Sequence, residues 1–304
     1  MPHEIERILA AAGGSHWLIE SGKAAEIVNV LALRAEGHKL DWDGPENNKV
    51  YAEEPSQARG GGRVHVLRLH GTIMPRGNMM TSMSGGASLE QFGAAFDEAA
   101  ADSTARAIVM DIDSPGGIAD FVPERARKIA AARRSGRPII AVANTMAASA
   151  AYWIAAAADE IVVSPSGRVG SIGVMTQRDN MRGALEKAGI TREMFSTAPR
   201  KLEGHPFASP LNAEARAAIM AEANALHDMF VGDVAKWRGV PEATVRADPE
   251  GADAHFGGGR VYHAERAVRL GMADRVATFE DTLTRAVRGG SRNVSTARKR
   301  LSTL

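Results

Sequence analysis

The sequence predicts an α/β protein in which buried parallel strands alternate with helices. The run ARAIVMDID at 105–113 is β-rich and nearly all apolar, which is typical of a strand covered on both faces. Two more short apolar runs follow, RPIIAVA at 137–143 and DEIVVS at 159–164, with helical segments between them. An order of strand, helix, strand, helix and strand gives right-handed crossovers and a parallel sheet.

Each neighbouring element has its own local signal. VHVLRLHGTI at 64–73 alternates apolar and polar residues as a strand does. Ser88 begins a capping-box pattern that opens a helix to about Ala101, and Asn212 can cap a long helix that reaches about Lys236. Further helices are expected over the segments 119–134, 147–158, 179–188 and 263–270.

The two ends of the chain differ from its centre. Residues 1–58 are expected to form an accessory segment, with helical apolar spacing over 4–12 and 17–35 before a polar, turn-rich linker. Residues 59–284 form the main domain. The tail at 285–304 carries six Lys or Arg and no acid, so we expect it to be disordered and able to touch an acidic partner.

Composition excludes several classes of function. The 304 residues include no cysteine, which excludes disulfides, thiolate metal sites and a cysteine nucleophile. A net charge of +1 argues against a nucleic-acid-binding surface. The N-terminus lacks a secretory pattern and the longest apolar stretch, 146–158, is too short to cross a bilayer, so we expect a soluble, cytoplasmic protein without membrane contact. With neither an HExxH motif nor a Walker A loop, no metal or other cofactor is expected.

Two small-residue turns follow predicted strands. Ser149 comes just after one strand, at the first turn of an Ala-rich helix, where backbone N–H groups favour an alkoxide or oxyanion. Gly116 and Gly117 follow Ser114-Pro115 after another strand, and their N–H groups can face a substrate carbonyl without an intervening Cβ. Both turns belong to the carboxyl edge of the sheet, where ligands bind in such folds.

A nucleophilic serine needs a base, and the residues alone leave two kinds open. No histidine lies between His70 and His205, and a triad built on either of these remains an alternative. Lys201, in STAPRKLEGHPF, is the other candidate. A lysine acts as a base only when desolvation or a nearby cation favours its neutral form; Arg200 is such a cation.

Four blocks in order carry a family resemblance: DSPGG, TMAASAAYWIAAAADEIVVSPSGRVGSIGV, PRKLEGHPF and FGGGRVYHAERAVRLGMADRV. Together they resemble the signal peptide peptidase A family of serine peptidases, and most closely its phage head or prohead maturation proteases. The resemblance spans about residues 63–280. It implies the ClpP/crotonase fold, a Ser–Lys dyad and assembly into a homo-oligomeric ring.

The resemblance assigns roles to individual residues. Ser149 matches the nucleophile, Lys201 the general base, Ser171 the serine that orients the lysine amine, and Gly116 and Gly117 the backbone oxyanion site. It implies a serine endopeptidase that processes scaffold, capsid or portal-associated proteins through an acyl-enzyme. Ala150-Ala151-Tyr152 stands where family members often have glycines after the nucleophile, and small residues suffice there.

Other functions remain as alternatives. These are a bacterial cytoplasmic peptidase of the same family, a crotonase-fold acyl-CoA enzyme, and a non-catalytic capsid-assembly protein. Acyl-CoA chemistry would leave Ser149 and Lys201 without a role. A loop with four methionines between Met74 and Met83 suits adaptable apolar contacts with a substrate or another subunit.

Overall fold

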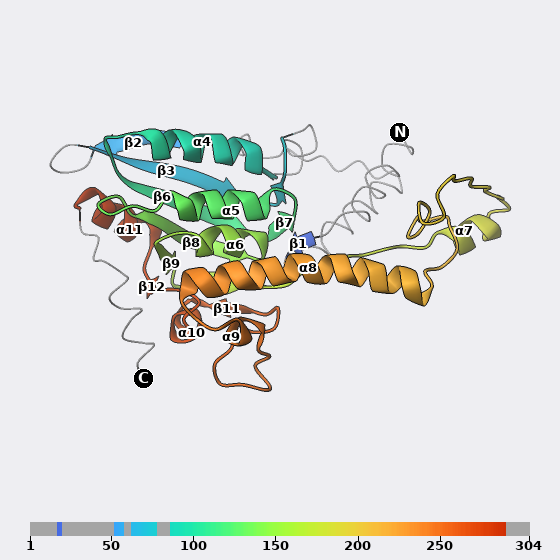
Figure 1. The fold of residues 1–304 in the computed structure, drawn as a ribbon. Coiled ribbons are helices and arrows are strands. Elements are labelled where there is room, and N and C mark those ends of the chain that lie inside the picture. Colours follow the sequence, from blue (N-terminus) through green and yellow to red (C-terminus); the bar gives the residue numbers. More distant parts are fainter. Residues whose placement is uncertain (1–16, 20–51, 58–61, 78–85, 290–304) are drawn as a thin grey trace.

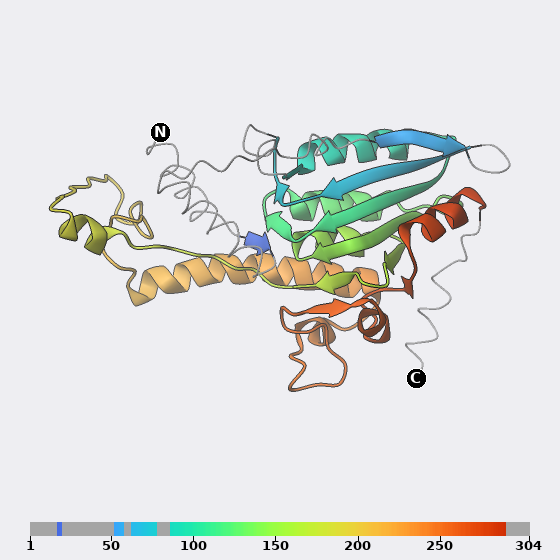
Figure 2. The same cartoon turned by 180° about the vertical axis from the view of Figure 1, so that it is seen from behind.

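The structure is a computed structural model that describes residues 17–19, 52–57, 62–77 and 86–289. Helices cover a large sheet, and a long helix and an extended segment project from one end of this body (Figures 1 and 2). The α/β class with a parallel sheet is confirmed. Within the described ranges, no helix is both long and apolar enough to cross a membrane.

Twelve strands are described along these ranges. They are β1 (Trp17–Ile19), β2 (Ala52–Gln57), β3 (Arg63–His70), β4 (Ile73–Met74), β5 (Ala87–Ser88), β6 (Ala105–Ser114), β7 (Gly116–Ile118), β8 (Ile139–Ala148), β9 (Glu160–Val163), β10 (Arg168–Gly170), β11 (Val261–His263) and β12 (Arg275–Val276). The helices are α4 (Leu89–Ala101), α5 (Val122–Ala131), α6 (Ala150–Ala156), α7 (Arg182–Lys187), α8 (Ala213–Arg238), α9 (Glu242–Arg246), α10 (Ala264–Arg269) and α11 (Phe279–Val287).

The strands form two sheets. In the larger one β3, β6 and β8 are parallel neighbours, and β8 pairs along its first half with β9 and along its last three residues with β10. β2 and β11 join it as antiparallel partners of β3 and β10. The smaller sheet has the order β1-β7-β4-β5. Since β7 follows β6 after a single residue, the smaller sheet begins where β6 leaves the larger one.

Alternation along the central strands gives the large sheet two apolar faces. On β8, Ile139, Ala141 and Ala143 belong to the main core under α4, α5, α6 and α8, whereas Ile140 and Val142 belong to a smaller cluster with α11. Helix α11 is held there by Glu160, whose carboxylate pairs with both Arg275 and Arg285. Burial on both faces explains why these strands read as continuous apolar runs.

The predicted helix caps are present. Ser88 Oγ accepts the Gln91 N–H at 3.3 Å, and Asn212 Oδ1 accepts the Ala215 N–H at 2.8 Å. Each side chain satisfies one of the N–H groups that a first helical turn leaves without a partner. At the far end of α10, Gly271 has a φ of +78°, as a glycine that ends a helix commonly does.

Two expectations for the N-terminal part were wrong where the structure describes it. Residues 17–19, predicted to open a helix over 17–35, form β1, because they pair with strand edges far away in the sequence. Residues 52–57, predicted as linker, form β2 along the edge of β3. Residues 285–287, predicted to begin a disordered tail, instead form the end of α11, where Arg285 pairs with Glu160. Several other predictions lie outside the described residues: those for the rest of the helices over 4–12 and 17–35, for Met79, Met80 and Met83, and for the tail beyond 289.

Candidate active site

Ser149 occupies the sharp junction between β8 and α6. Its backbone has φ 55° and ψ −117°, a conformation that side-chain-bearing residues rarely adopt. The Ser149 N–H donates to Gly170 O at 2.8 Å, which fixes this junction against β10. Its Oγ is buried and has no hydrogen-bond partner among the described residues. A strained residue that also carries an unpaired buried hydroxyl is a recognised sign of a functional site.

Ser171 stands beside Ser149 at the end of the neighbouring strand. β8 and β10 are parallel and end together, with Ala148 paired to Gly170, and the residue that follows each strand is a serine. Ser171 has a φ of 56°, close to that of Ser149, and its N–H donates to Arg260 O at 2.8 Å. The structure therefore brings these two predicted site residues together.

The glycine turn reaches the same place from β6. Gly116 has a φ of +100°, and a Cβ built on it would lie 3.0 Å from Ala148 O and clash with Leu18 O. Its N–H donates to Ser114 Oγ at 3.2 Å. Gly117 is as tightly enclosed, since a Cβ there would clash with the Ile73 backbone. Only residues without a side chain allow β1, β4 and the Ser149 junction to approach the turn this closely.

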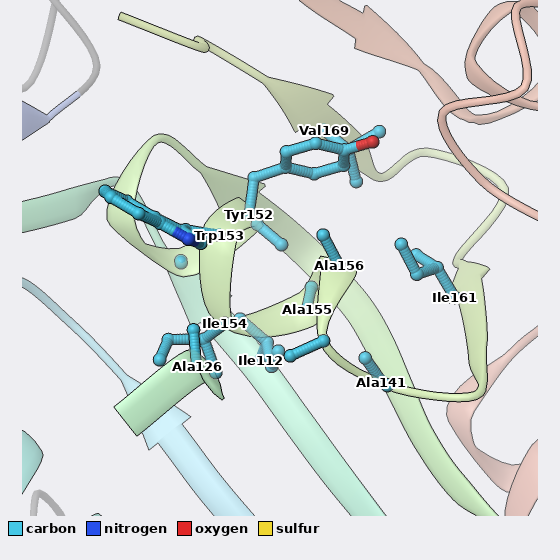
Figure 3. Packing of buried hydrophobic residues seen from close by; sticks show 14 of the residues in the cluster. Ile112, Ala126, Ala141, Tyr152, Trp153, Ile154, Ala155, Ala156, Ile161 and Val169 are labelled. Carbon is cyan, nitrogen blue, oxygen red and sulfur yellow. The ribbon is translucent and has the colours of Figure 1, made fainter. Parts of the chain in front are cut away.

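Helix α6 holds the serine junction from behind. All of its seven side chains are fully buried, as expected for a helix without a polar face. Figure 3 shows how those of residues 152–156 pack among their apolar neighbours. The Trp153 ring stacks on Phe230 of α8, with centroids 4.5 Å apart, and Trp153 Nε1–H donates to Asp233 Oδ2 at 3.1 Å. On another side of α6, the Tyr152 hydroxyl donates to Met272 O at 2.9 Å. These contacts fix the helix that begins directly after Ser149.

Lys201 does not join this group within one chain. It belongs to the arm, which we define as residues 177–212, and both views show the arm extending away from the sheets (Figures 1 and 2). Helix α8 carries the far end of the arm: from Phe230 back to Ala213 it rises by about 26 Å. Lys201 is exposed, while its neighbour Arg200 pairs with Glu203 at 2.7 Å.

The two histidine alternatives are also separate from Ser149. His70 Nε2 bonds to Asp111 Oδ2 at 3.0 Å, and His70 ends β3, two strands away from β8 in the sheet. Adjacent strands are about 4.8 Å apart, so His70 is roughly 10 Å from the β8 axis. His205 lies on the arm with its ring 5.7 Å from that of Phe207.

Sequence reasoning missed the segment that lies on the glycine turn. β1 pairs antiparallel with β7, with Leu18 opposite Gly117 and Ile19 opposite Gly116. On its other side, Trp17 exchanges two backbone hydrogen bonds with Met175, at 2.8 and 2.9 Å. The apolar triplet Trp17-Leu18-Ile19 was a signal, but helical spacing across 17–35 masked it.

A family model and several individual proteins match this chain. A family model described as "Peptidase family S49" matches residues 131–291. The chain is 31% identical over 265 residues to "Capsid assembly protease C" of Escherichia phage lambda, covering 87% of this chain and 55% of that protein. It is 28% identical over 271 residues to "Protease 4" of Salmonella typhi, covering 86% of this chain and 42% of that protein.

The alignments cover most of this chain but only part of each relative. The chain spans about half the length of the curated relatives that it matches. Among solved structures, a mutant of ClpP1 from Listeria monocytogenes superposes with a TM-score of 0.42 at 14% identity, over 72% of this chain and 94% of that one.

Proposed function

Since the chain belongs to Peptidase family S49, we propose that it is a serine endopeptidase in which Ser149 is the nucleophile and Lys201 the general base. The observation that carries the proposal is the strained Ser149 junction, whose buried Oγ is unpaired beside Ser171 and the Gly116 turn. Ser149 Oγ attacks the substrate carbonyl while the neutral Lys201 amine takes its proton. The lysine then protonates the leaving amine, and water hydrolyses the acyl-enzyme ester.

The surrounding groups support this chemistry. The oxyanion donors in this mechanism are the backbone N–H groups of Gly116, which bonds to Ser114 Oγ in this structure, and of Gly117, which lies opposite Leu18; both have to turn to the substrate. The N–H of Ala150 is a further donor because it opens α6 and has no partner within the helix. Ser171 orients the lysine amine. Preorganised donors of this kind are worth about 3–4 kcal/mol each in the transition state of acyl transfer.

The position of the arm supports a dyad in which Lys201 reaches the Ser149 of another copy. The arm extends away from its own body at the end of α8 (Figures 1 and 2), and we propose that the lysine it carries serves the Ser149 of an adjoining subunit. Large apolar side chains are exposed on the arm and on the part of α8 that carries it: Phe195 is 89% exposed and Met220 is 53% exposed. Such residues suit a homo-oligomeric contact that would bury them.

Single substitutions and their mixture test both parts. Ser149→Ala and Lys201→Ala should each abolish cleavage of a quenched fluorescent peptide library. Ser166→Ala and Lys187→Ala should not, since Ser166 is an exposed serine between β9 and β10 and Lys187 is an exposed lysine on the arm. Co-expression of the two inactive chains should restore roughly a quarter of wild-type activity, because half of the serines and half of the lysines are intact and pair at random in the oligomer.

The outcomes distinguish the existence of the Ser149–Lys201 dyad from its formation between two copies. Turnover retained by either single variant would overturn the dyad. Loss in both variants without any recovery in the mixture would instead mean that Lys201 serves its own chain after the arm has moved.

The similarity to a phage capsid assembly protease leads us to propose scaffold or capsid-associated proteins as substrates. In a head-assembly reaction, the Ser149→Ala protein should then leave the scaffold uncleaved. A bacterial housekeeping peptidase is the second candidate, since the similarity to Protease 4 is nearly as high. In that case the scaffold is processed equally with and without the active serine.

A further inference from the structure

The three residues of β1 lie as an extended strand between two backbone edges. On one side, the Trp17 N–H donates to Met175 O and the Met175 N–H donates to Trp17 O. Because the backbone groups of successive strand residues point to opposite sides, those of Leu18 face its partner Gly117 on β7. The chain thus provides a slot that receives an extended peptide by strand addition, a common mode of peptide recognition.

This slot leads directly to the proposed nucleophile. β1 runs toward the Gly116 end of β7, where Ile19 pairs with Gly116. That glycine in turn approaches Ala148 O, the carbonyl just before Ser149. A substrate whose acyl part paired with the same edge of β7 would run in the same chain direction as β1 and would lead to Ser149.

The slot also buries apolar side chains. Leu18 is fully buried and Ile19 is 5% exposed, and Leu18 belongs to the main hydrophobic core. A peptide with aliphatic residues at these two positions would leave the same apolar surface covered. The slot therefore combines backbone pairing with side-chain selection for aliphatic residues.

Ser149 is covered in this arrangement. The residue is 1% exposed and its Oγ has no access to solvent, so a substrate cannot reach it without a movement of the chain. β1 lies on the turn that a substrate must reach. We propose that β1 is an intramolecular occupant of the substrate groove, which mimics the acyl part of an aliphatic peptide and must leave before a substrate can bind. This inference rests on the proposed peptidase function.

Peptide binding to locked and released forms of the chain tests the proposal. The chain has no cysteine, so Trp17→Cys with Ile118→Cys creates a single possible disulfide, between residues that pair directly across β1 and β7. Since Trp17 directs its backbone groups to Met175, it faces Ile118 as a non-hydrogen-bonded pair, whose Cα separation of about 4.5 Å suits a disulfide. Leu18→Asp releases β1, because a carboxylate cannot occupy the apolar site.

The probe is a dye-labelled synthetic peptide of residues 15–21, SHWLIES, followed by fluorescence anisotropy in a Ser149→Ala background that prevents turnover. A tethered strand competes at an effective concentration of about a millimolar, so locking should weaken peptide binding at least about tenfold and release should strengthen it at least about tenfold. Reduction of the disulfide should restore the affinity of the parent. The two single-cysteine variants under the same oxidation, and the peptide SHWDIES, are the controls.

If β1 had only a structural role, peptide affinity would not rise from the locked form through the reduced form to the released form. Equal binding by the locked and reduced forms, or no binding by either the reduced or the released form, would overturn the proposal. If Leu18→Asp fails to fold by circular dichroism, the locked and reduced forms of the cysteine pair still decide. The readout is binding rather than cleavage, so failure of the peptidase proposal would appear separately, as absent turnover both in the wild-type chain and in the Leu18→Asp chain with Ser149 intact.

Discussion

The end of α8 is fixed by a buried ion pair, and breaking this pair should destabilise the whole fold. Arg238 Nη1 and Nη2 bond to the two carboxylate oxygens of Asp274 at 2.9 and 3.0 Å. The two side chains are only 2% and 9% exposed. Arg238 also donates twice to Gly271 O, and Asp274 Oδ2 accepts the Ile161 N–H at 2.7 Å. The pair thus connects α8 to β9 and to the turn before β12.

Arg238→Met leaves the Asp274 carboxylate buried without its cation, and such a loss costs about 3–5 kcal/mol. For a domain of this size, 1 kcal/mol lowers Tm by about 2–4 °C, so the expected decrease is roughly 6–20 °C. Urea unfolding followed by circular dichroism measures the free energy of unfolding directly. The double variant Arg238→Met with Asp274→Asn should lose less than the sum of the two single losses, by about 0.5–3 kcal/mol, because it leaves no unpaired charge.

The exposed pair Arg182–Glu186 is a matched control. Its N–O distance is also 2.9 Å, but its side chains are 53% and 63% exposed. Arg182→Met should therefore cost no more than about 1 kcal/mol. If Arg238→Met is as mild as Arg182→Met, or if the Arg238 and Asp274 losses are strictly additive, burial does not determine the strength of the pair and the reasoning fails.

Two further predictions concern the acid range and the glycine turn. Hydrogen bonds from Thr104 and His65 hold the pKa of Asp102 at about 2, below its ordinary 3.8, so Asp102 stabilises the fold above pH 3.8 and this stabilisation is lost as the pH falls through 2. Asp102→Asn should flatten the dependence of unfolding free energy on pH between 4 and 2; an unchanged slope in acid titration would contradict this. Gly117→Ala should destabilise the protein by about 1–3 kcal/mol or more in urea unfolding and reduce peptide turnover, because its Cβ meets the rigid Ile73 backbone. Gly173→Ala, which has nothing within 4 Å, should be neutral, and equal effects of the two changes would show that crowding is not the cause.

Much of the fold could be predicted because its signals are local. The apolar runs on β6, β8 and β9 and the caps at Ser88 and Asn212 depend on neighbouring residues only. β1 could not be found in this way. A strand of three residues has little preference of its own, and its pairing is supplied by Gly117 and Met175, about 100 and 160 residues further along the chain.

The same difference holds within the candidate site, where the sequence could place some residues together but not all of them. Ser149, Ser171 and Gly116 meet because each follows the end of a strand in one sheet, and the order of the strands makes that meeting predictable. The position of Lys201 depends instead on the direction in which α8 leaves the body. That direction is set by tertiary contacts such as the Trp153–Phe230 stack, which no sequence pattern around Lys201 reveals.

The two proposals together require two events before Ser149 can act, and their kinetics differ. Departure of β1 from the groove occurs within one chain, so its rate does not depend on protein concentration. Arrival of Lys201 from another copy depends on association, so it becomes limiting on dilution. Leu18→Asp removes the first requirement and leaves the second, because Leu18 belongs to β1 and not to the arm. Its gain in activity should therefore be largest at high protein concentration and vanish on dilution, whereas a dyad formed within one chain would keep the gain at every concentration.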